Sequence, residues 1–369
     1  LVIAAAVAFA NATSSAQLAS QYPTSGGTYV YGRERLGQWW GFLAGWGFVI
    51  GKTASCAAMA LTFAAYVAPA GWQRPVAAAA VVAVTAVSYR GVSRTARLAR
   101  VVVTVVLLGL AAVVVAGLSA GGADLSRAAF WDGGPTSPAG VLQSAGLLFF
   151  AFAGYARVAT LGEEVRDPVR TIPRAITVAL AITVVLYAAV GLTVLTLLGP
   201  DGAARIPAPL AVVAAATGLA WVPAGFAVAA AAASLGALLA LLAGVARTAL
   251  AMARAGDLPG WLAAVHPRFA VPHRAEVVVG GVVVALVLAV DLRGAIGFSS
   301  LGVLVYYLVA NLAARTQSGV HRRYPRALQW IGAAACAVLA LTLPWGAVLG
   351  GAAVLALGLV VRAARLRRG

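Results

Sequence analysis

Long apolar runs, separated by short polar connections, constrain this chain more than any other feature of its sequence. A helix needs about 20 mostly apolar residues to cross a bilayer, and eleven runs approach or exceed that length. They cover residues 1–18, 39–66, 75–89, 101–119, 140–161, 176–198, 221–246, 277–290, 295–314, 328–343 and 347–361. The apolar stretch 206–220 carries two prolines, so we predict an interfacial piece there rather than a further span.

Composition supports the same interpretation. Of the 369 residues, 62% are hydrophobic and only 10% are charged, which excludes an ordinary soluble domain. The sequence therefore predicts an all-α polytopic membrane protein embedded in the lipid bilayer.

Positive charge orients the predicted spans. Most of the 27 basic residues fall in alternate loops and in the C-terminal tail, so a single topology fits all eleven runs. By the positive-inside rule the N-terminus is outside and the C-terminus is cytoplasmic, in the cell membrane. Because the basic residues lie between apolar runs rather than on one patch, we expect no nucleic-acid partner. An outer N-terminus that begins inside an apolar run also predicts one further helix upstream, which would make twelve.

Lys52 is the only lysine of the chain and lies near the middle of the predicted span 39–66. It is roughly 21 Å from either end of that span at the helical rise, too deep for its side chain to reach the surface. A charge at this depth costs several kcal/mol unless it is paired, so such residues are often functional. We therefore take Lys52 as a candidate for proton coupling. The alternative is a structural lysine that binds helix-end carbonyls across the bundle.

Three charged residues lie near the end of the predicted span 140–161 or directly after it. Arg157 lies near its end, where it could reach the cytoplasm, pair with Glu163 or Glu164, or line a ligand pathway. The simplest interpretation of Glu163 and Glu164 is a solvated helix end, and they are also candidates for a cytoplasmic gate. None of the ten acidic residues lies well within a span, so we expect no carboxylate proton relay.

The sequence gives little indication of metal binding or of catalysis. Cys56 and Cys336 lie in apolar runs, and the three histidines lack metal-ligand spacing, so no metal or cofactor is predicted. No nucleophile–base pair or His/Asp/Glu constellation lies within the spans, which argues against an enzyme and leaves no catalytic residue to name. Small residues recur every four positions along the second run, which predicts close helix packing. They are Gly37, Gly41 and Gly45, followed by Gly47, Gly51 and Ser55.

Residues 149–174 are the most informative stretch. They begin as a span, loosen at Ala153-Gly154, and end in a charged loop punctuated by prolines. A helix that stops at mid-depth must have its freed backbone groups satisfied by protein, water or ligand. Glycine-interrupted spans are the best sequence pointer to a transporter's binding site. We therefore expect the site on this helix.

The same stretch resembles helix six and its following loop in the amino acid–polyamine–organocation transporters. The resemblance rests on aromatic-Ala-Phe-x-Gly followed by Glu-Glu-Val-x-Asp-Pro-x-Arg-x-Ile-Pro-Arg. Residues 22–31 with 41–46, and residues 247–259 with 266–269, agree with the family in order and in predicted side of the membrane. The likeness covers a single domain, 1–369: family helices two to five in 1–120, six to ten in 139–315, and eleven and twelve in 328–362.

This resemblance implies a LeuT-type fold of two inverted five-helix repeats and two further helices, of which eleven of the twelve helices are present. In that family the substrate lies between the broken first and sixth helices. By position, Phe150 would be an aromatic gate over the substrate. The unwound segment, whose carbonyls would receive the substrate's amino group, would be Ala151, Phe152, Ala153 and Gly154. Tyr155 and Arg157 complete the substrate-binding candidates.

Three departures from the family pattern bear on the substrate and the coupling ion. The family's first helix, with its glycine-rich break, lies outside the chain. Ala156 stands where many members carry an acid, and Arg157 follows it. The lysine that some proton-coupled members carry on helix five has no counterpart in 101–119, whereas Lys52 lies on helix three. Loss of the acid and gain of an arginine argue against a strongly cationic substrate.

Together these features predict a secondary active transporter, a permease that moves an amino acid or related amine by alternating access. Its partners would be that small molecule and a coupling ion, which we expect to be the proton. The alternative is a non-transporting membrane subunit or sensor that keeps the same fold.

Overall fold

The computed structural model describes residues 1–22, 26–91, 96–119, 124–128, 137–154, 167–206 and 208–367, and every regular element in these ranges is helical. The helices are α1 (Val2–Gln21), α2 (Thr28–Leu36), α3 (Gln38–Val67), α4 (Gln73–Tyr89), α5 (Ala96–Ser119), α6 (Pro138–Phe152), α7 (Pro168–Arg205), α8 (Pro209–Ala216), α9 (Trp221–Arg254), α10 (His273–Ala289), α11 (Leu292–Arg315), α12 (Arg326–Thr342) and α13 (Trp345–Leu366). Each predicted apolar run overlaps one helix, and the regular elements of the described residues are all helical, as predicted.

Three features differ from the prediction in detail. Helix α6 ends at Phe152, well before the predicted limit of its span at residue 161. Helix α2 occupies a stretch that the apolar pattern leaves as a connection, because its residues are largely polar. Helix α7 runs past its predicted end and kinks at Gly199, whose φ of 67° is accessible to glycine, directly before Pro200.

The number of membrane spans is supported only in part. Among the described residues, seven helices are long and apolar enough to cross a bilayer by length and composition. They lie in α1, α3, α5, α7, α9, α11 and α13. Helices α6 and α12 are apolar but shorter.

Helices α3 and α11 cross at the centre of the molecule, where small residues replace large side chains. A Cβ added to Gly302 of α11 would lie 2.5 Å from the carbonyl oxygen of Gly47 and 2.7 Å from the Cα of Gly51. One turn further along, the hydroxyls of Ser55 and Ser299 are 2.6 Å apart. Lipid provides no hydrophobic force between helices, so association depends on such close approach. Close packing is confirmed for Gly41, Gly45, Gly47 and Gly51 of the predicted row, whereas a Cβ added to Gly37 would meet nothing within 4 Å.

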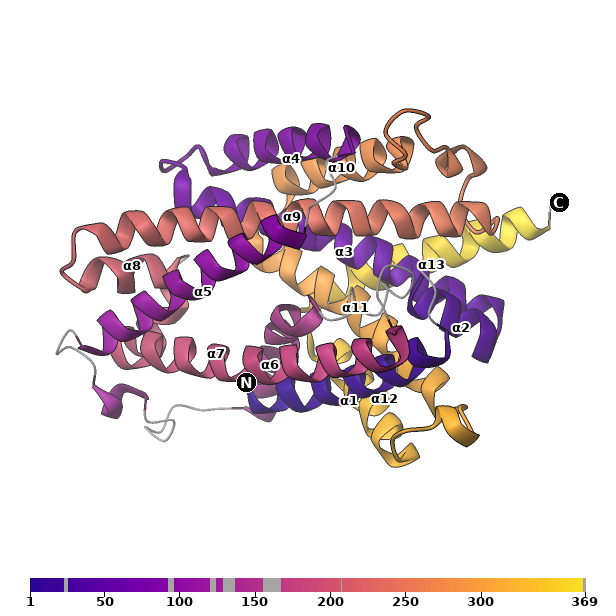
Figure 1. The fold of residues 1–369 in the computed structure, drawn as a ribbon, viewed down its shortest axis with the longest axis horizontal. Coiled ribbons are helices and arrows are strands. Elements are labelled where there is room, and N and C mark those ends of the chain that lie inside the picture. The colour runs from indigo at the N-terminus through magenta and orange to yellow at the C-terminus, as the bar shows by residue number, and fades with distance from the viewer. Residues whose placement is uncertain are drawn as a thin grey trace.

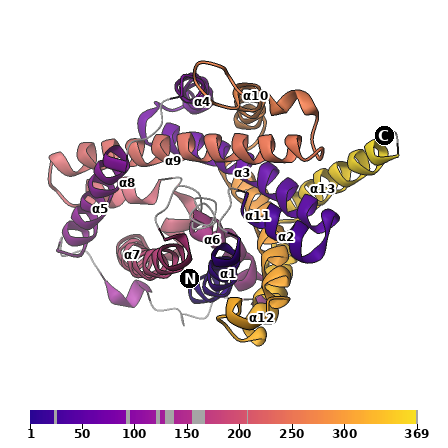
Figure 2. The same ribbon diagram turned by 45° about the vertical axis from the view of Figure 1, so that its right-hand side comes forward.

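The other helices lie on either side of this pair. Helix α9 runs along α3, and the pair α4 and α10 lies outside it (Figure 1). On the opposite side α1 packs against α7, α6, α11 and α12, an arrangement that is also visible in the turned view (Figure 2). The chain therefore forms one helical body around α3 and α11.

A buried polar contact fixes α1 against α11. It joins the only two asparagines of the chain: the side-chain nitrogen of Asn311 donates to Oδ1 of Asn11 at 2.6 Å. The hydroxyl of Ser14 donates to Oδ1 of Asn311 at 2.7 Å. In a bilayer such side chains pair across helices, because the alternative is a polar group facing hydrocarbon.

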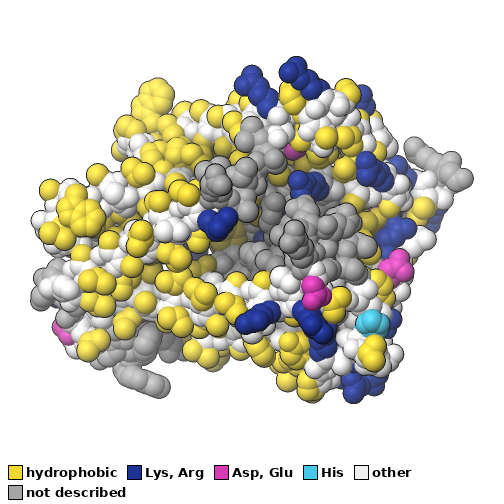
Figure 3. Space-filling view, in the orientation of Figure 1, with side chains coloured by type: hydrophobic (Ala, Val, Ile, Leu, Met, Phe, Trp, Pro, Cys, Tyr) yellow, Lys and Arg dark blue, Asp and Glu magenta, His cyan; other side chains and the backbone are white. Residues whose placement is uncertain are grey.

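The surface has the character of a membrane protein. Large aliphatic side chains are exposed on several helices, including Val185 on α7, Val228 on α9 and Val282 on α10. Figure 3 shows this apolar surface over most of the molecule, with basic side chains gathered toward the end that holds α2 and the C-terminal part of α13. Such a broad apolar surface exceeds what soluble monomers tolerate. We call the region where the basic side chains gather the basic end.

Candidate functional site

The site is built on the end of α6. This helix starts at an N-cap, Ser137, whose hydroxyl accepts from the backbone nitrogen of Gly140 at 3.0 Å. It ends at Phe152, where Ala153 leaves the helical conformation at φ −69° and ψ 4°. Its 15 residues span only about 22 Å at the helical rise, against a hydrocarbon core of about 30 Å. The helix thus stops partway, at the position where the sequence predicts that it loosens.

Two carbonyl groups at this end are bound by side chains from other helices. The ammonium of Lys52, on α3, donates to the carbonyl oxygen of Ala153 at 3.1 Å. The hydroxyl of Tyr187, on α7, donates to the carbonyl oxygen of Ala151 at 2.7 Å. The last carbonyls of a helix lack intrahelical donors and carry partial negative charge, so a cation and a hydroxyl are suitable partners. We call Ala151, Ala153, Lys52 and Tyr187 the α6-end cluster.

Lys52 is only 5% exposed, and its position fits both sequence interpretations. The structural alternative requires a helix-end carbonyl, and Ala153 provides one. The coupling hypothesis requires a place beside the interrupted helix, and the same contact supplies it. In the part of the chain that the structure describes, no carboxylate pairs with this ammonium. Among the described residues, its hydrogen-bond partner is the carbonyl of Ala153 at the α6 end.

Aromatic side chains surround the cluster. The ring of Phe152 is 3% exposed and lies 5.1 Å from the ring of Tyr187 in an edge-to-face arrangement. Phe150, the predicted gate, is half-buried and packs against the core formed by α3, α4, α9 and α10. Gly154 is exposed, and a Cβ added there would meet nothing within 4 Å. Among the described residues, none therefore covers Gly154 where α6 ends.

Four predicted site residues lie outside the described residues: Tyr155, Arg157, Glu163 and Glu164. Their assignments as substrate-binding and gate candidates stay predictions.

A second charged cluster lies at the basic end. The carboxylate of Asp257, which follows α9, accepts from the hydroxyl of Tyr29 at 2.7 Å and from Arg33 at 2.9 Å, both on α2. It also accepts from Nε of Arg362, on α13, at 2.7 Å. Burial and the adjacent carboxylate raise the pKa of Tyr29 above its usual range, so the phenol stays protonated and donates. These four residues, the Asp257 cluster, tie together three helices that are far apart in sequence.

Tyr187 and the pairing of Asp257 were not predicted from the sequence. A signal for Tyr187 exists, because it is the only aromatic residue in the otherwise aliphatic run 176–198. For Asp257 the sequence indicates only an acidic residue at the cytoplasmic side. Its partner Arg362 lies 105 residues away, in the last helix, and no spacing rule connects the two.

The sequence of this chain is similar to those of known transporters. The profile of a family described as amino acid permease matches residues 1–360. The chain is 57% identical over 365 residues to an "uncharacterized transporter" of Mycobacterium tuberculosis, with 99% of this chain and 82% of the relative covered. It is 29% identical over 324 residues to a methylthioribose transporter of Bacillus subtilis, covering 82% and 67% of the two chains. A branched-chain amino acid permease of the same bacterium is 25% identical over 391 residues, with 98% and 83% covered.

Proposed function

Because the chain belongs to the amino acid permease family, we propose that it moves an amino acid or a related amine across the cell membrane by alternating access, coupled to the proton. The family consists of multi-pass membrane transporters with a LeuT-type fold, and the protein is a transporter rather than an enzyme. The named relatives carry different substrates, methylthioribose and branched-chain amino acids. The substrate class proposed here therefore rests on the α6 end.

The observation that carries the proposal is the hydrogen bond from Lys52 to Ala153. It puts the one intramembrane lysine on the carbonyl segment that would receive a substrate's amino group. In our proposal the substrate lies beside residues 150–154, with Phe150 over it. Tyr155 and Arg157 continue the pathway, and Glu163 and Glu164 line its cytoplasmic gate. The C-terminus is cytoplasmic, as the distribution of basic residues predicts.

Charge repulsion links the substrate to Lys52. Two cations about 4 Å apart repel by about 4 kcal/mol at an effective dielectric constant near 20. A substrate ammonium that takes the carbonyl of Ala153 therefore favours the neutral form of Lys52 or its movement away. Substrate binding and protonation of Lys52 then oppose each other, and this reciprocal coupling would allow substrate to be exchanged for a proton. The same repulsion disfavours substrates with a second positive charge.

The test is uptake of a panel of radiolabelled neutral amino acids into proteoliposomes with and without an imposed pH gradient. Lys52→Met should abolish gradient-driven uptake while the protein still folds, because methionine keeps most of the unbranched side chain and removes its charge. Substrate exchange at equal pH should persist. If gradient-driven uptake is unchanged, Lys52 is a packing residue that caps α6.

Tyr187→Phe is the matched control, since it removes the hydrogen bond to Ala151 without changing charge. We expect slower uptake that keeps its dependence on the pH gradient. If both variants lose that dependence equally, the α6 end must be held in place for transport and Lys52 has no separate coupling role. If the folded parent protein takes up no member of the panel, the non-transporting alternative gains support.

A further inference from the structure

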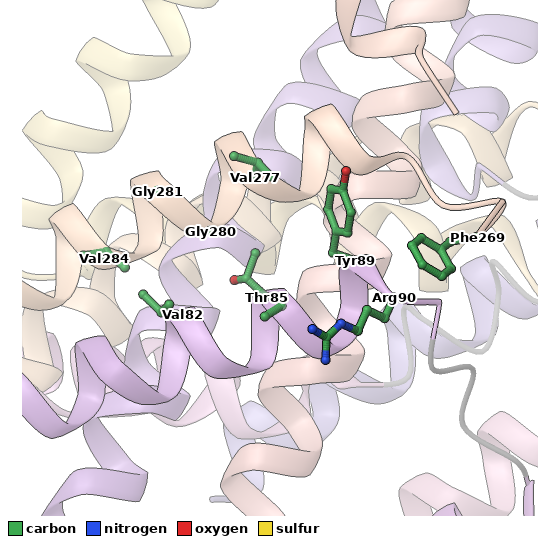
Figure 4. Close-up of a pocket in the computed structure, with 10 residues that line it drawn as sticks. Val82, Thr85, Tyr89, Arg90, Phe269, Val277, Gly280, Gly281 and Val284 are labelled. Carbon is green, nitrogen blue, oxygen red and sulfur yellow. The ribbon is translucent and has the colours of Figure 1, made fainter. Parts of the chain in front are cut away.

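An open groove lies between α4 and α10, on the side of the molecule away from the α6-end cluster (Figures 1 and 4). It runs along residues 82–90 on one side and 277–284 on the other, with Phe269 at one end, and has a cavity volume of about 610 Å³. That volume falls within the range of about 300–1,000 Å³ typical of small-molecule sites. We call it the α4–α10 groove.

Two adjacent glycines of α10 shape the groove. Gly280 sets the spacing of the helices, because a Cβ there would lie 2.6 Å from the hydroxyl of Thr85 on α4. Gly281 has no neighbour within 4 Å of an added Cβ, so its missing side chain leaves open space. The walls are aliphatic, with Val82 60% and Val277 55% exposed. The groove thus has an apolar lining that no part of the described protein fills.

One end of the groove is aromatic and basic. Tyr89 and Phe269 lie there with Arg90, as Figure 4 shows. The guanidinium of Arg268 lies 5.5 Å from the centre of the Phe269 ring, and both arginines are exposed. In the part of the chain that the structure describes, no carboxylate pairs with either arginine. Arg90 thus lines the groove end, and Arg268 adds a second positive charge next to it, over Phe269.

The acidic residue beside the groove wall on α10 is turned away from this charge. Glu276 precedes the groove wall on α10, yet it is only 1% exposed. Its carboxylate accepts from the hydroxyl of Ser88 at 2.8 Å, on the protein side of α4. Its negative charge is thus turned into the protein and away from a ligand in the groove.

The dimensions match one leaflet of a bilayer. Residues 82–90 cover about 12 Å at the helical rise, close to half of a hydrocarbon core of about 30 Å. Aromatic side chains favour the membrane–water interface, which places Tyr89 and Phe269 at headgroup level. Basic pockets between helices on the cytoplasmic side are suited to acidic lipid headgroups.

We propose that the α4–α10 groove binds one anionic phospholipid of the cytoplasmic leaflet. One acyl chain lies over Gly281 between the two helices, and Arg90 and Arg268 hold the phosphate-containing headgroup. A second groove, lined by residues 102–107 of α5 and 233–240 of α9, has only aliphatic and small residues and is about 280 Å³ in volume.

Native mass spectrometry of the full chain tests the proposal, with dioleoyl phosphatidylglycerol and dioleoyl phosphatidylcholine as competing probes. Arg90→Gln should reduce the preference for phosphatidylglycerol in the first bound lipid about fivefold, the factor expected for one arginine near the headgroup. Arg74→Gln is the matched control, because Arg74 is exposed at the opposite end of α4. It should leave the preference unchanged.

Gly281→Leu tests the acyl-chain part of the groove. It should lower occupancy of the first site for both lipids, while Gly191→Leu on α7, where an added Cβ also meets nothing within 4 Å, should not. Equal effects of Arg90→Gln and Arg74→Gln would overturn the proposal, as would full binding by Gly281→Leu. A dimer that dissociates in Gly281→Leu would likewise overturn it, because a second copy of the chain would then fill the groove.

Discussion

Replacing Asp257 by asparagine removes the only negative charge of the Asp257 cluster while keeping nearly the same shape. The side chain is 5% exposed and accepts three hydrogen bonds, from Tyr29, Arg33 and Arg362. Arg362 is itself 4% exposed and lies 4.4 Å from the ring of Trp39. In the variant its guanidinium stays buried without a counter-charge.

The size of the effect follows from this burial. Breaking a buried ion pair by removing one partner costs about 3–5 kcal/mol, because the remaining charge is left uncompensated. Arg33 is 26% exposed, so Arg33→Gln breaks a better solvated contact and should cost only about 1 kcal/mol. Asp257→Asn should therefore lower the unfolding temperature on the order of 5–10 °C, and Arg33→Gln clearly less.

The assay is thermal unfolding of the purified full chain in detergent, followed by tryptophan fluorescence and checked by size exclusion. Asp291→Asn is the control: Asp291 caps α11 through its contact with the backbone of Gly294, and asparagine caps equally well. Its unfolding temperature should match that of the parent. If Asp257→Asn also matches the parent, or loses no more than Arg33→Gln, the cluster does not stabilise the basic end.

Three further outcomes follow from the packing and from the predicted pathway. Gly302→Ala should prevent folding or strongly destabilise the protein, because its Cβ would lie 2.5 Å from a backbone oxygen of α3; Gly191→Ala, with open space around it, should not, as expression and size exclusion would show. Asn311→Leu should cost about 1–2 kcal/mol in thermal unfolding, since it removes the interhelical hydrogen bonds between α1 and α11. Arg157→Ala should change substrate selectivity in competition uptake assays if this residue lines the pathway; a loss of expression alone would instead indicate a residue that anchors the helix end.

The helices themselves could be predicted from the sequence because their formation in a membrane is a local matter. Each span must satisfy its own backbone hydrogen bonds, so a run of about 20 apolar residues is enough to specify it. The interruption of α6 could be read for the same reason, since Ala153-Gly154 and the charged loop lie within one stretch. The small-residue row of α3 could also be predicted from the sequence, although its contact with Gly302 could not.

The boundaries were less predictable where local composition is ambiguous. The apolar pattern continues past Phe152, so it extended the sixth-helix span to residue 161. Helix α2 carries Arg33, Glu34 and Arg35, and a polar segment of this kind has no hydrophobic pattern to mark it.

The membrane class, the order of the helices, the buried lysine and the interrupted helix can all be inferred from the sequence. The partners of that interruption appear only in the folded chain: Lys52 reaches Ala153 from 101 residues away, and Tyr187 reaches Ala151 from another helix. The pairing of Asp257 with Arg362 also appears only in the structure. The same holds for Asn11 and Asn311, which lie 300 residues apart. Lipid provides no hydrophobic driving force between apolar helices. Their lateral arrangement therefore depends on a few contacts of small and polar residues, which leave no periodic signal along the chain.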